Sequence, residues 1–443
     1  MNDKPLFTRL TQIEPSEVRA ALVSFLFIFM LMASYFIMKP VRDALPSDWG
    51  SVSTAQQWTI TFLVSTVAVS IYNFLSARFS PQAIVPAVFA FFAATFFLIF
   101  CAYKIGVSDT SLGRMFLKWG ITNGFLGKVF YVWSSVFSLF HVSVFWSFLS
   151  QIYKKEESKR IFSFINTGAS AGAIFGPSLL LLFPIGNKVE YILLITSVVL
   201  LATLPLIRLL NKEATKAGKQ DLSQVKLSPN PFKGFKEFIT HKRLLGIAAF
   251  IFVFTGISAF LYGIQLDWLA DYSEEQRTRI LSVVELVTNS LTILIGFFFT
   301  NRLVRRFGLP VSLGIVPFVL AILLIALSFN PAIFLFFAFQ VIRRAGNYAV
   351  TRPSREILFT AVDKEARFRT KPIIDVAVYR GGDVFWIWIV AFCSDKLGFG
   401  VTGLLLATAF VCLLLATIGF VLGRNHARES VTEESGEEVT VPG

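Results

Sequence analysis

The sequence is poor in charged residues, and this scarcity sets its class. Only 16% of its 443 residues are charged, whereas 55% are hydrophobic and the mean hydropathy is +0.66. A soluble chain of this length would form domains that each need a polar surface, and so few charges cannot cover one. The composition therefore excludes an ordinary soluble protein and predicts a polytopic membrane protein.

Cysteine and histidine are also scarce, at three residues each. Cys101, Cys393 and Cys412 all lie in apolar runs and form no CxxC motif, so they predict neither a disulfide framework nor a zinc site. The sequence also lacks paired catalytic carboxylates, a nucleophile elbow and a metal-ligand cluster. We therefore expect no enzyme, no metal site and no cofactor.

The net charge of +13 would suggest nucleic acid in a soluble protein. In this chain the bases lie in loops between apolar runs, where they set orientation and contact anionic lipid. We therefore expect a lipid bilayer, and no nucleic acid, around the protein. The bases gather in segments that are cytoplasmic when the N-terminus is inside, which predicts that both termini are cytoplasmic. The first apolar run carries no cleavage site, so we expect it to be a retained span.

Apolar runs long enough to cross a membrane recur along the whole chain, at about 20 residues each. They predict twelve spans, near residues 20–38, 55–77, 82–104, 125–150, 161–183, 188–209, 244–265, 280–300, 309–329, 331–352, 372–393 and 398–422.

A basic polar segment, 211–243, divides the twelve spans into two halves of six, and the two halves contain similar sequences. NFLSARFSPQAIVP, starting at Asn73, resembles NRLVRRFGLPVSLGIVP, starting at Asn301. Both copies fall after the second span of their half. Duplicated six-span halves predict an all-α, major-facilitator-like transporter with its substrate site between the halves near the midplane. The predicted parts are a cytoplasmic segment 1–19, the halves 20–210 and 244–422, the linker 211–243 and a cytoplasmic, disordered tail 423–443.

Charges inside spans are costly, so each one needs a partner, a water-filled cavity or a function. The richest stretch is QVIRRAGNYAVTRPSREILFTAVDKEARFRTKPIIDVAVYRGGD, residues 340–383. On a regular helix one face carries Arg344, Tyr348, Arg352 and Arg355. Pro353 should kink or break the span and leave backbone carbonyls without a hydrogen bond. Beside Arg343, such carbonyls are tolerated within a membrane only where they face a cavity.

A second face follows the basic loop of this stretch and carries Asp375, Tyr379 and Asp383. One interpretation is that the arginines pair with Asp375, Asp383 or Glu356 in structural or gating bridges. The other is that the whole set lines a polar cavity.

Two further spans carry polar groups. His141, in span four near Ser134, is either a proton-coupling group or a buried neutral histidine bonded to a neighbouring helix. Glu285, in span eight, either pairs with a base of the other half or lies at the outer interface. The small residues of GASAGAIFGP, 168–177, predict close helix packing.

The stretch YFIMKPVRDALPSD, residues 35–48, places charge at the end of the first span. Lys39, Arg42 and Asp43 are either an interface anchor or part of a site. A second proline-broken basic stretch, TRPSREI, lies in the other half. We expect Arg42 to be a substrate-binding residue, and Lys39 is the residue of the three that we most expect to be only an anchor.

Three stretches resemble the ATP/ADP translocase family of plastids and intracellular bacteria. FWSFLSQIYKKEESKRIFSFINTGASAGAIFG, residues 145–176, is similar to that family's Phe-Trp-Gly-Phe run, its Lys-Arg-Phe loop and its Gly-Ala-rich fifth span. YFIMKPVRDAL resembles the family's first-span ending, Ile-Leu-Arg-Asp-Thr-Lys-Asp-Val-Leu. Residues 351–376 resemble its Asp-Pro-Thr-Lys-Glu-Met and Lys-Ala-Ala-Ile-Asp-Val runs.

The resemblance implies a twelve-span major-facilitator-like fold and antiport of ATP for ADP, or related nucleotide import. The family's basic residues at the ends of spans one and ten fall on Arg42 and Arg355 by motif position. Its acids in spans four and seven fall on Ser134 and Gln265, with Asp267 near the latter. The charge that binds an anion is kept, while both acids are replaced.

We therefore expect a secondary active transporter, acting as a monomer in a bacterial inner membrane, that carries an anionic, phosphorylated solute. Nucleotide is the leading substrate. The alternatives are a proton-coupled carrier of another organic anion, in which Glu285, Asp267 or His141 titrates, and a non-transporting membrane protein that reuses the fold. The residues expected to bind substrate are Arg42, Arg355, Lys39, Arg343, Arg344, Tyr348, Ser134 and Gln265. Those expected to act in gating or coupling are Asp43, Glu285, Glu356, Asp375, Asp383, His141 and Asp267.

Overall fold

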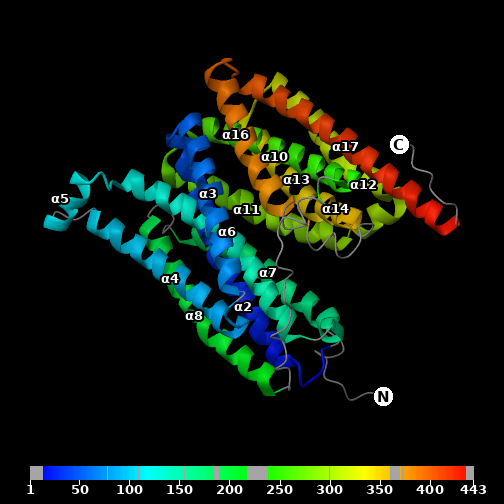
Figure 1. The fold of residues 1–443 in the computed structure, drawn as a ribbon. Helices are drawn as coiled ribbons and strands as arrows, with labels where there is room; N and C mark the ends of the chain where they lie inside the picture. The colour runs from blue at the N-terminus through cyan, green and yellow to red at the C-terminus, as the bar shows by residue number, and fades with distance from the viewer. Residues whose placement is uncertain are drawn as a thin grey trace. The chain divides into compact units, whose positions relative to one another are not determined.

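The computed structural model describes residues 13–76, 78–106, 110–153, 155–183, 189–216, 238, 240–298, 300–359, 370 and 374–435. These ranges are helical nearly throughout and contain no strand (Figure 1). In chain order the elements are α2 (Val18–Ala44), the 3-10 turn η1 (Leu45–Asp48), α3 (Ser51–Ser76), α4 (Pro81–Gly106), α5 (Ser111–Lys118), α6 (Asn123–Ile152), α7 (Lys155–Leu182), α8 (Val189–Lys216), α10 (Lys242–Leu269), α11 (Glu274–Phe298), α12 (Thr300–Phe329), α13 (Ile333–Gly346), the π turn η2 (Asn347–Thr351), α14 (Arg352–Leu358), the π turn η4 (Ile374–Val378), α16 (Tyr379–Asp395) and α17 (Val401–Ser435).

In the described ranges, ten helices are long and apolar enough to cross a membrane. They coincide with ten of the twelve predicted spans. The other two predictions, 331–352 and 372–393, fall on α13–η2–α14 and η4–α16, where π turns interrupt the α-helix. The prediction of an all-α polytopic membrane protein is therefore confirmed. The hydropathy pattern missed α5, a helix capped by Thr110, because it is too short and too polar to resemble a span.

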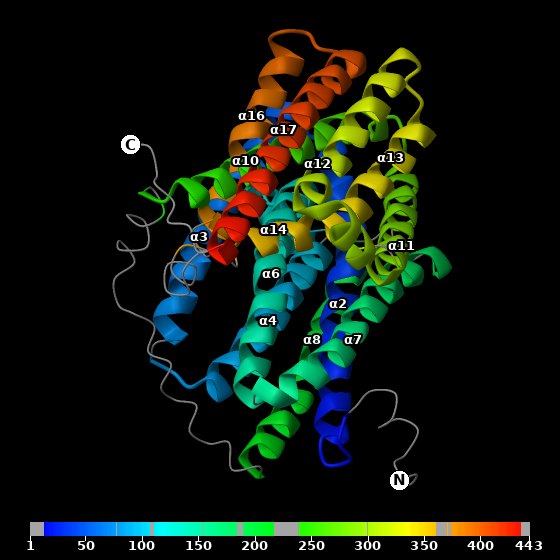
Figure 2. The same ribbon diagram turned by 90° about the vertical axis from the view of Figure 1, so that its right-hand side faces the viewer.

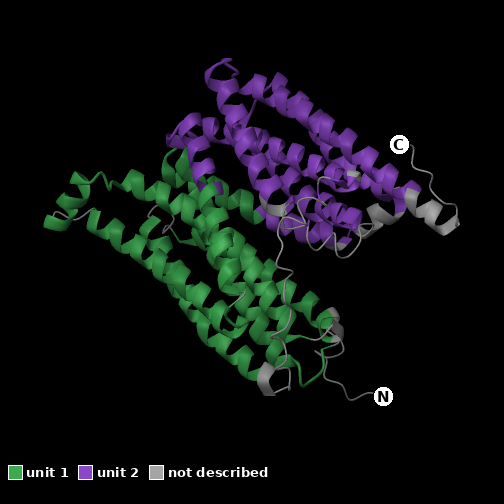
Figure 3. Ribbon diagram, viewed as in Figure 1, with its two compact units in different colours: residues 1–46, 63–227, 272–286 green, residues 47–62, 228–271, 287–443 purple. Residues whose placement is uncertain are grey.

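The residues group into two compact units, shown in separate colours in Figure 3. Unit 1 comprises Met1–Pro46, Leu63–Leu227 and Tyr272–Leu286, and unit 2 comprises Ser47–Phe62, Ser228–Asp271 and Val287–Gly443. Unit 1 thus contains most of the first six spans together with the beginning of α11. The beginning of α3 belongs to unit 2.

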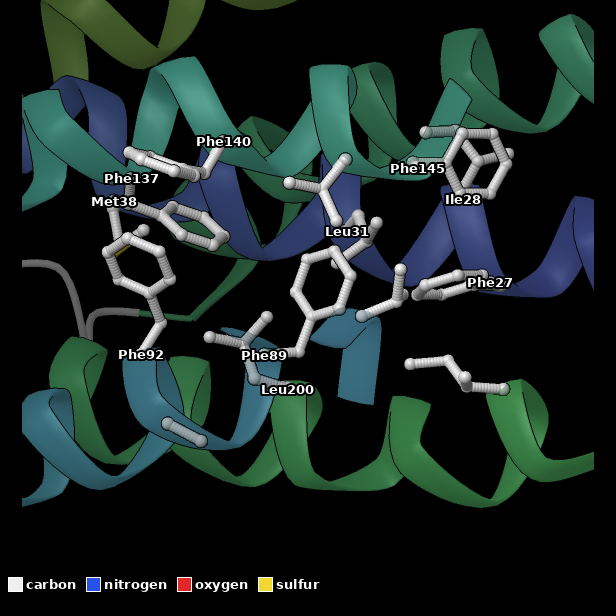
Figure 4. Close-up of a cluster of buried hydrophobic side chains, with 14 of the residues drawn as sticks. Phe27, Ile28, Leu31, Met38, Phe89, Phe92, Phe137, Phe140, Phe145 and Leu200 are labelled. Carbon is white, nitrogen blue, oxygen red and sulfur yellow. The ribbon is translucent and has the colours of Figure 1, made fainter. Parts of the chain in front are cut away.

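The core of unit 1 is built from aromatic rings of α2, α4 and α6 (Figure 4). Phe27 meets Phe89 and Phe145 edge to face, at centroid distances of 5.4 and 5.1 Å. Phe92 packs against Phe137 at 5.1 Å in the same manner. Such pairs add to the stabilisation from burial alone, so these three helices form a firmly packed group.

Three glycines of α7 face α2, and the two helices lie side by side (Figures 1 and 2). A Cβ atom added at Gly168 or Gly176 would lie 2.7 or 2.8 Å from a carbonyl oxygen of α2, and one at Gly172 would collide with Phe29 O. The two backbones therefore touch. The predicted close packing of the small-residue segment is what the structure shows.

In unit 2, α12 consists of two helices that meet at Gly308, whose φ of 74° is accessible mainly to glycine. The second copy of the repeated segment, residues 301–317, contains this kink and is helical on both sides of it, whereas the predicted spans left residues 301–308 as a loop. The part of α12 after the kink packs on α17, where an ideal Cβ on Gly419 would lie 3.0 Å from Leu313 O. The two helices run together in Figure 1.

The interruption expected at Pro353 takes the form of the π turn η2, which ends immediately before α14. The N–H of Arg352 donates to Asn347 O, a bond spanning five residues instead of four. A π turn contains one residue more than an α turn, so it changes the direction of every later side chain. Pro40, by contrast, lies inside α2, which continues to Ala44.

Candidate functional site

Four charged residues of unit 1 form what we call the N-terminal charge cluster: Lys39, Arg42 and Asp43 at the end of α2, and Glu285 of α11. Lys39 Nζ donates to Glu285 Oε1 at 2.6 Å, and the side chains are 13% and 4% exposed. The expectation that Lys39 is only an interface anchor is therefore wrong, because an anchor would hold its ammonium in water. Of the two alternatives given for Glu285, the structure shows the ion pair, and the base is Lys39.

Arg42 and Asp43 are neighbours in sequence and also pair with each other. Arg42 donates to Asp43 Oδ1 from Nε at 2.8 Å and from Nη2 at 2.7 Å. The guanidinium lies 6.0 Å from the ring centroids of Tyr35 and Tyr131. Both bases of this cluster thus contact a carboxylate, and the cluster is neutral overall.

His141 lies close to this cluster, and its ring is stacked on Tyr35 at 4.6 Å. It is 3% exposed, and Nδ1 lies 3.2 Å from Phe137 O of its own helix. The alternative of a bond from His141 to a neighbouring helix is not realised among the described residues. Ser134 donates to Tyr131 O at 3.1 Å, so its hydroxyl is already used by the backbone.

Unit 2 contains the C-terminal basic cluster, which we define as Arg343, Arg355 and Glu356 with the neutral residues that hold Arg343. The guanidinium of Arg343 is buried, at 9% exposure. Its Nε donates to Gln340 Oε1 at 3.1 Å and its Nη1 to Ser258 Oγ at 3.2 Å. Gln340 in turn donates to Gln265 Oε1 at 3.4 Å.

Every group that holds Arg343 is therefore neutral. Within the described part of the chain, Arg343 forms no ion pair with a carboxylate. A buried charge without an opposite charge is costly, so this guanidinium differs from the bases of the N-terminal charge cluster.

Arg355, in α14, is the second buried base of the cluster. It is 9% exposed, and its Nη2 lies 3.6 Å from Glu356 Oε1. The Glu356 side chain is 38% exposed, so water screens this contact. The Nε atom of Arg355 is buried and has no hydrogen-bond partner within the described ranges. The positive charge of Arg355 is thus only weakly compensated.

The π turn decides which arginines share a face. On an uninterrupted α-helix Arg343 and Arg355 would point about 120° apart, and Arg344 would align with Arg355. One extra residue in η2 instead brings Arg343 to within about 20° of Arg355 and turns Arg344 about 80° away. The burial agrees, since Arg343 and Arg355 are buried whereas Arg344 is half-buried.

The other residues expected from sequence lie apart from the charge pairs of the two clusters. Tyr348 is 41% exposed, and Asp267 is exposed near the end of α10. Asp383 is half-buried and forms no ion pair with Arg343 or Arg355 in the described ranges. The side chain of Asp375 lies outside the described residues.

Two residues of the C-terminal basic cluster were not predicted from the sequence, namely Gln340 and Ser258. Gln340 lies one turn before Arg343, at the start of the stretch 340–383, and Ser258 lies on another helix. The sequence did contain one indication of such partners. Arg343 lies in a span and has no acidic residue three or four positions away, which implies that neutral groups must form its hydrogen bonds.

Comparison with known proteins agrees with this fold. A family model described as Major Facilitator Superfamily matches residues 23–354. The chain is 24% identical to ADP,ATP carrier protein 1 of Chlamydia muridarum (strain MoPn / Nigg), over 83% of this chain and 80% of that protein. This relative confirms the resemblance inferred from the motifs.

Two solved structures share the fold at low identity. A bacterial homologue of the iron transporter ferroportin, in an inward-facing state, aligns with a TM-score of 0.62 at 14% identity, covering 92% of this chain and 99% of that one. The nucleoside transporter NupG aligns with a TM-score of 0.60 at 12% identity, with the same coverage. Because the family model extends from the first span into α14, the chain belongs to the Major Facilitator Superfamily.

Proposed function

We propose that this protein is a secondary active transporter of a multiply anionic, phosphorylated solute, with a nucleotide of the ATP/ADP type as the first candidate. The observation that carries the proposal is the buried Arg343, whose contacts in the described structure are all neutral. A transporter of anions needs such a charge, because the substrate then supplies the opposite charge that the protein withholds.

Energetics favour this role over a purely structural one. A structural buried arginine is normally paired, since removing it from water costs several kcal/mol. Gln340 and Ser258 orient the guanidinium without neutralising it, and Arg355 adds a second positive charge on the same face. Each guanidinium can bind phosphoryl oxygens through paired N–H donors. Twelve residues of helix, roughly 18 Å, separate the two arginines, so we propose that they contact different parts of an extended substrate.

The nucleotide is favoured by the chlamydial relative, whose name is that of an ADP,ATP carrier. The presence of Ser134 and Gln265 in place of the acids of the resembled family leaves the anion-binding charge intact. We further propose that the protein is a monomer in a bacterial inner membrane with both termini in the cytoplasm.

The direct test is uptake of radiolabelled ATP and ADP by cells that express the full-length chain, with membrane insertion verified. We expect uptake that accelerates when the opposite side is preloaded with unlabelled nucleotide, because an exchanger needs a solute to return. Absence of uptake for both nucleotides, in cells that contain the inserted protein, would contradict the nucleotide assignment.

A second candidate is proton-coupled transport of another organic anion, favoured by the partly buried Lys39–Glu285 pair. A proton bound to Glu285 would remove the charge that holds Lys39, so protonation and movement of α11 would be linked. Asp267 and His141 are the other titratable groups considered for this role. This mechanism predicts uptake driven by an imposed pH gradient without any counter-substrate, which an exchanger does not show.

A further inference from the structure

The turn of helix that contains Arg355 holds three buried polar groups that have no hydrogen-bond partner in the described part of the chain. Thr351 is 3% exposed, Ser354 is 0% exposed and Arg355 is 9% exposed. The atoms concerned are Thr351 Oγ1, Ser354 Oγ and Arg355 Nε. Three unsatisfied polar groups within five residues are costly unless a ligand, an ion or ordered water satisfies them.

These three side chains lie on one face, because positions i, i+3 and i+4 of a helix are neighbours. The Cβ atom of Thr351 is therefore about 5–6 Å from those of Ser354 and Arg355, so the three donors can be directed toward one small ion. Pro353 lies within the same turn and has no N–H of its own. The donors of this turn are thus two hydroxyls and a guanidinium.

Other buried hydroxyls of unit 2 fall into two groups: those of Thr61 and Thr288 also have no partner in the described ranges, whereas others are satisfied by their own helix. Thr255 donates to Phe252 O at 2.7 Å, and Thr408 donates to Leu404 O at 2.6 Å. Such bonds to the preceding turn are the ordinary way for a helix to satisfy a buried serine or threonine. Thr351 ends the π turn and Ser354 follows it, so the carbonyls of the preceding turn are displaced from their α-helical positions.

We propose that Thr351, Ser354 and Arg355 form a binding site for a terminal phosphoryl group, with one donor for each of its three outer oxygens. The proposal rests on the anion transport proposed above and deepens it by naming the group recognised. A carboxylate has two oxygens, so one of them would have to accept two of the three hydrogen bonds. Because all three groups are buried in this conformation, the phosphoryl group enters when α14 moves.

The test uses the purified full-length protein, with its melting temperature followed against inorganic phosphate and, at matched ionic strength, sulfate and acetate. Binding to the native state raises the melting temperature by mass action. We expect phosphate to raise it more than acetate does. Thr351→Val and Ser354→Ala should each weaken the apparent phosphate affinity about tenfold, since each removes a hydrogen bond to a charged group.

Two sets of control variants separate hydroxyl loss from damage to the fold. Thr351→Ser and Ser354→Thr keep the hydroxyl and should keep the phosphate response. Thr408→Val removes a buried hydroxyl that the backbone already uses, and should also leave the response unchanged. If Thr351→Val and Ser354→Ala respond to phosphate as the wild type does, the hydroxyls are not ligands. An equal response to acetate, or no response to any anion, also overturns the site.

The two proposals fail in different ways. Unchanged nucleotide uptake by Thr351→Val and Ser354→Ala overturns the phosphoryl site and leaves the proposed transport standing. Absence of nucleotide uptake by the wild type contradicts the proposed transport itself.

Discussion

Each base of the N-terminal charge cluster contacts a carboxylate, at 2.6 Å for Lys39 and 2.7 Å for Arg42, whereas Arg343 of the C-terminal basic cluster contacts none among the described residues. The bases of the C-terminal basic cluster are buried and those of the N-terminal charge cluster are half-buried, and each cluster includes a segment that contains a proline. A neutral cluster is stable without a ligand and holds helices together. A positive cluster reaches neutrality only with an anion bound. We therefore propose a structural or coupling role for the first and anion binding for the second.

The largest effect should come from breaking the balance of the N-terminal charge cluster. Glu285→Gln leaves the half-buried Lys39 without the carboxylate with which it pairs, which we expect to lower the free energy of unfolding by at most about 3–5 kcal/mol. Thermal unfolding of the purified protein measures the loss. The double variant Lys39→Met/Glu285→Leu removes both charges and should recover most of the stability. A Glu285→Gln protein as stable as the wild type would show that the pair is not buried in the membrane.

Arg343→Met tests the opposite behaviour in the C-terminal basic cluster. We expect the affinity for ATP to fall about a hundredfold, while the ligand-free protein melts at a higher temperature because an uncompensated buried charge is gone. Melting curves with and without ATP measure both quantities. Arg424→Met, at an exposed position of α17, is the matched control. A ligand-free protein that is destabilised by Arg343→Met would argue for a structural arginine.

Gln265→Glu would make the two clusters alike. The new carboxylate would lie beside Gln340, two hydrogen bonds from Arg343, and would supply the acid that the C-terminal basic cluster lacks at this position. We expect anion affinity to fall about tenfold by partial neutralisation. Gln265→Leu, which adds no charge, is the comparison. Equal losses for the two variants would show that the amide, and not the charge, matters at this position.

The smallest effect is expected for Glu356→Gln. The carboxylate is 3.6 Å from Arg355 and 38% exposed, so the pair contributes less than about 1 kcal/mol. Transport and binding should change by less than about threefold. A loss as large as that of Arg343→Met would show that Arg355 is balanced by Glu356 after all, and would remove the contrast between the clusters.

The fold could be predicted from the sequence because hydropathy alone locates spans. The two spans that π turns interrupt, α13–η2–α14 and η4–α16, are ones with several charges in or beside their apolar runs. Freed carbonyls and buried bases are both tolerable only beside a cavity or other protein groups, so the two can occur in one span. Charge alone does not interrupt a helix, since α2 carries Lys39, Arg42 and Asp43 and remains α-helical to Ala44. The interruption at Pro353 was predicted, whereas the interruption at Ile374–Val378 and the π geometry of both were not.

The site could be predicted only in part, and the reason is geometric. Assigning faces by a constant turn of 100° placed Arg344 beside Arg355, and one extra residue in η2 moved Arg343 there instead. No sequence rule marks a π turn in advance. The Lys39–Glu285 pair joins residues 246 positions apart, so the sequence could suggest that Glu285 needs a base but not which one.

The glycine contact between α2 and α7 has a mechanical consequence. Where Gly168, Gly172 and Gly176 meet α2, these positions place no side chain of α7 between the two backbones, so no rotamers there can rearrange to absorb a displacement. The two helices must then move as one rigid unit, so the charges at the end of α2 move together with both helices. A displacement of Lys39 by α11 therefore also moves α7, because no α7 side chain at the three glycines can adjust its conformation to absorb it.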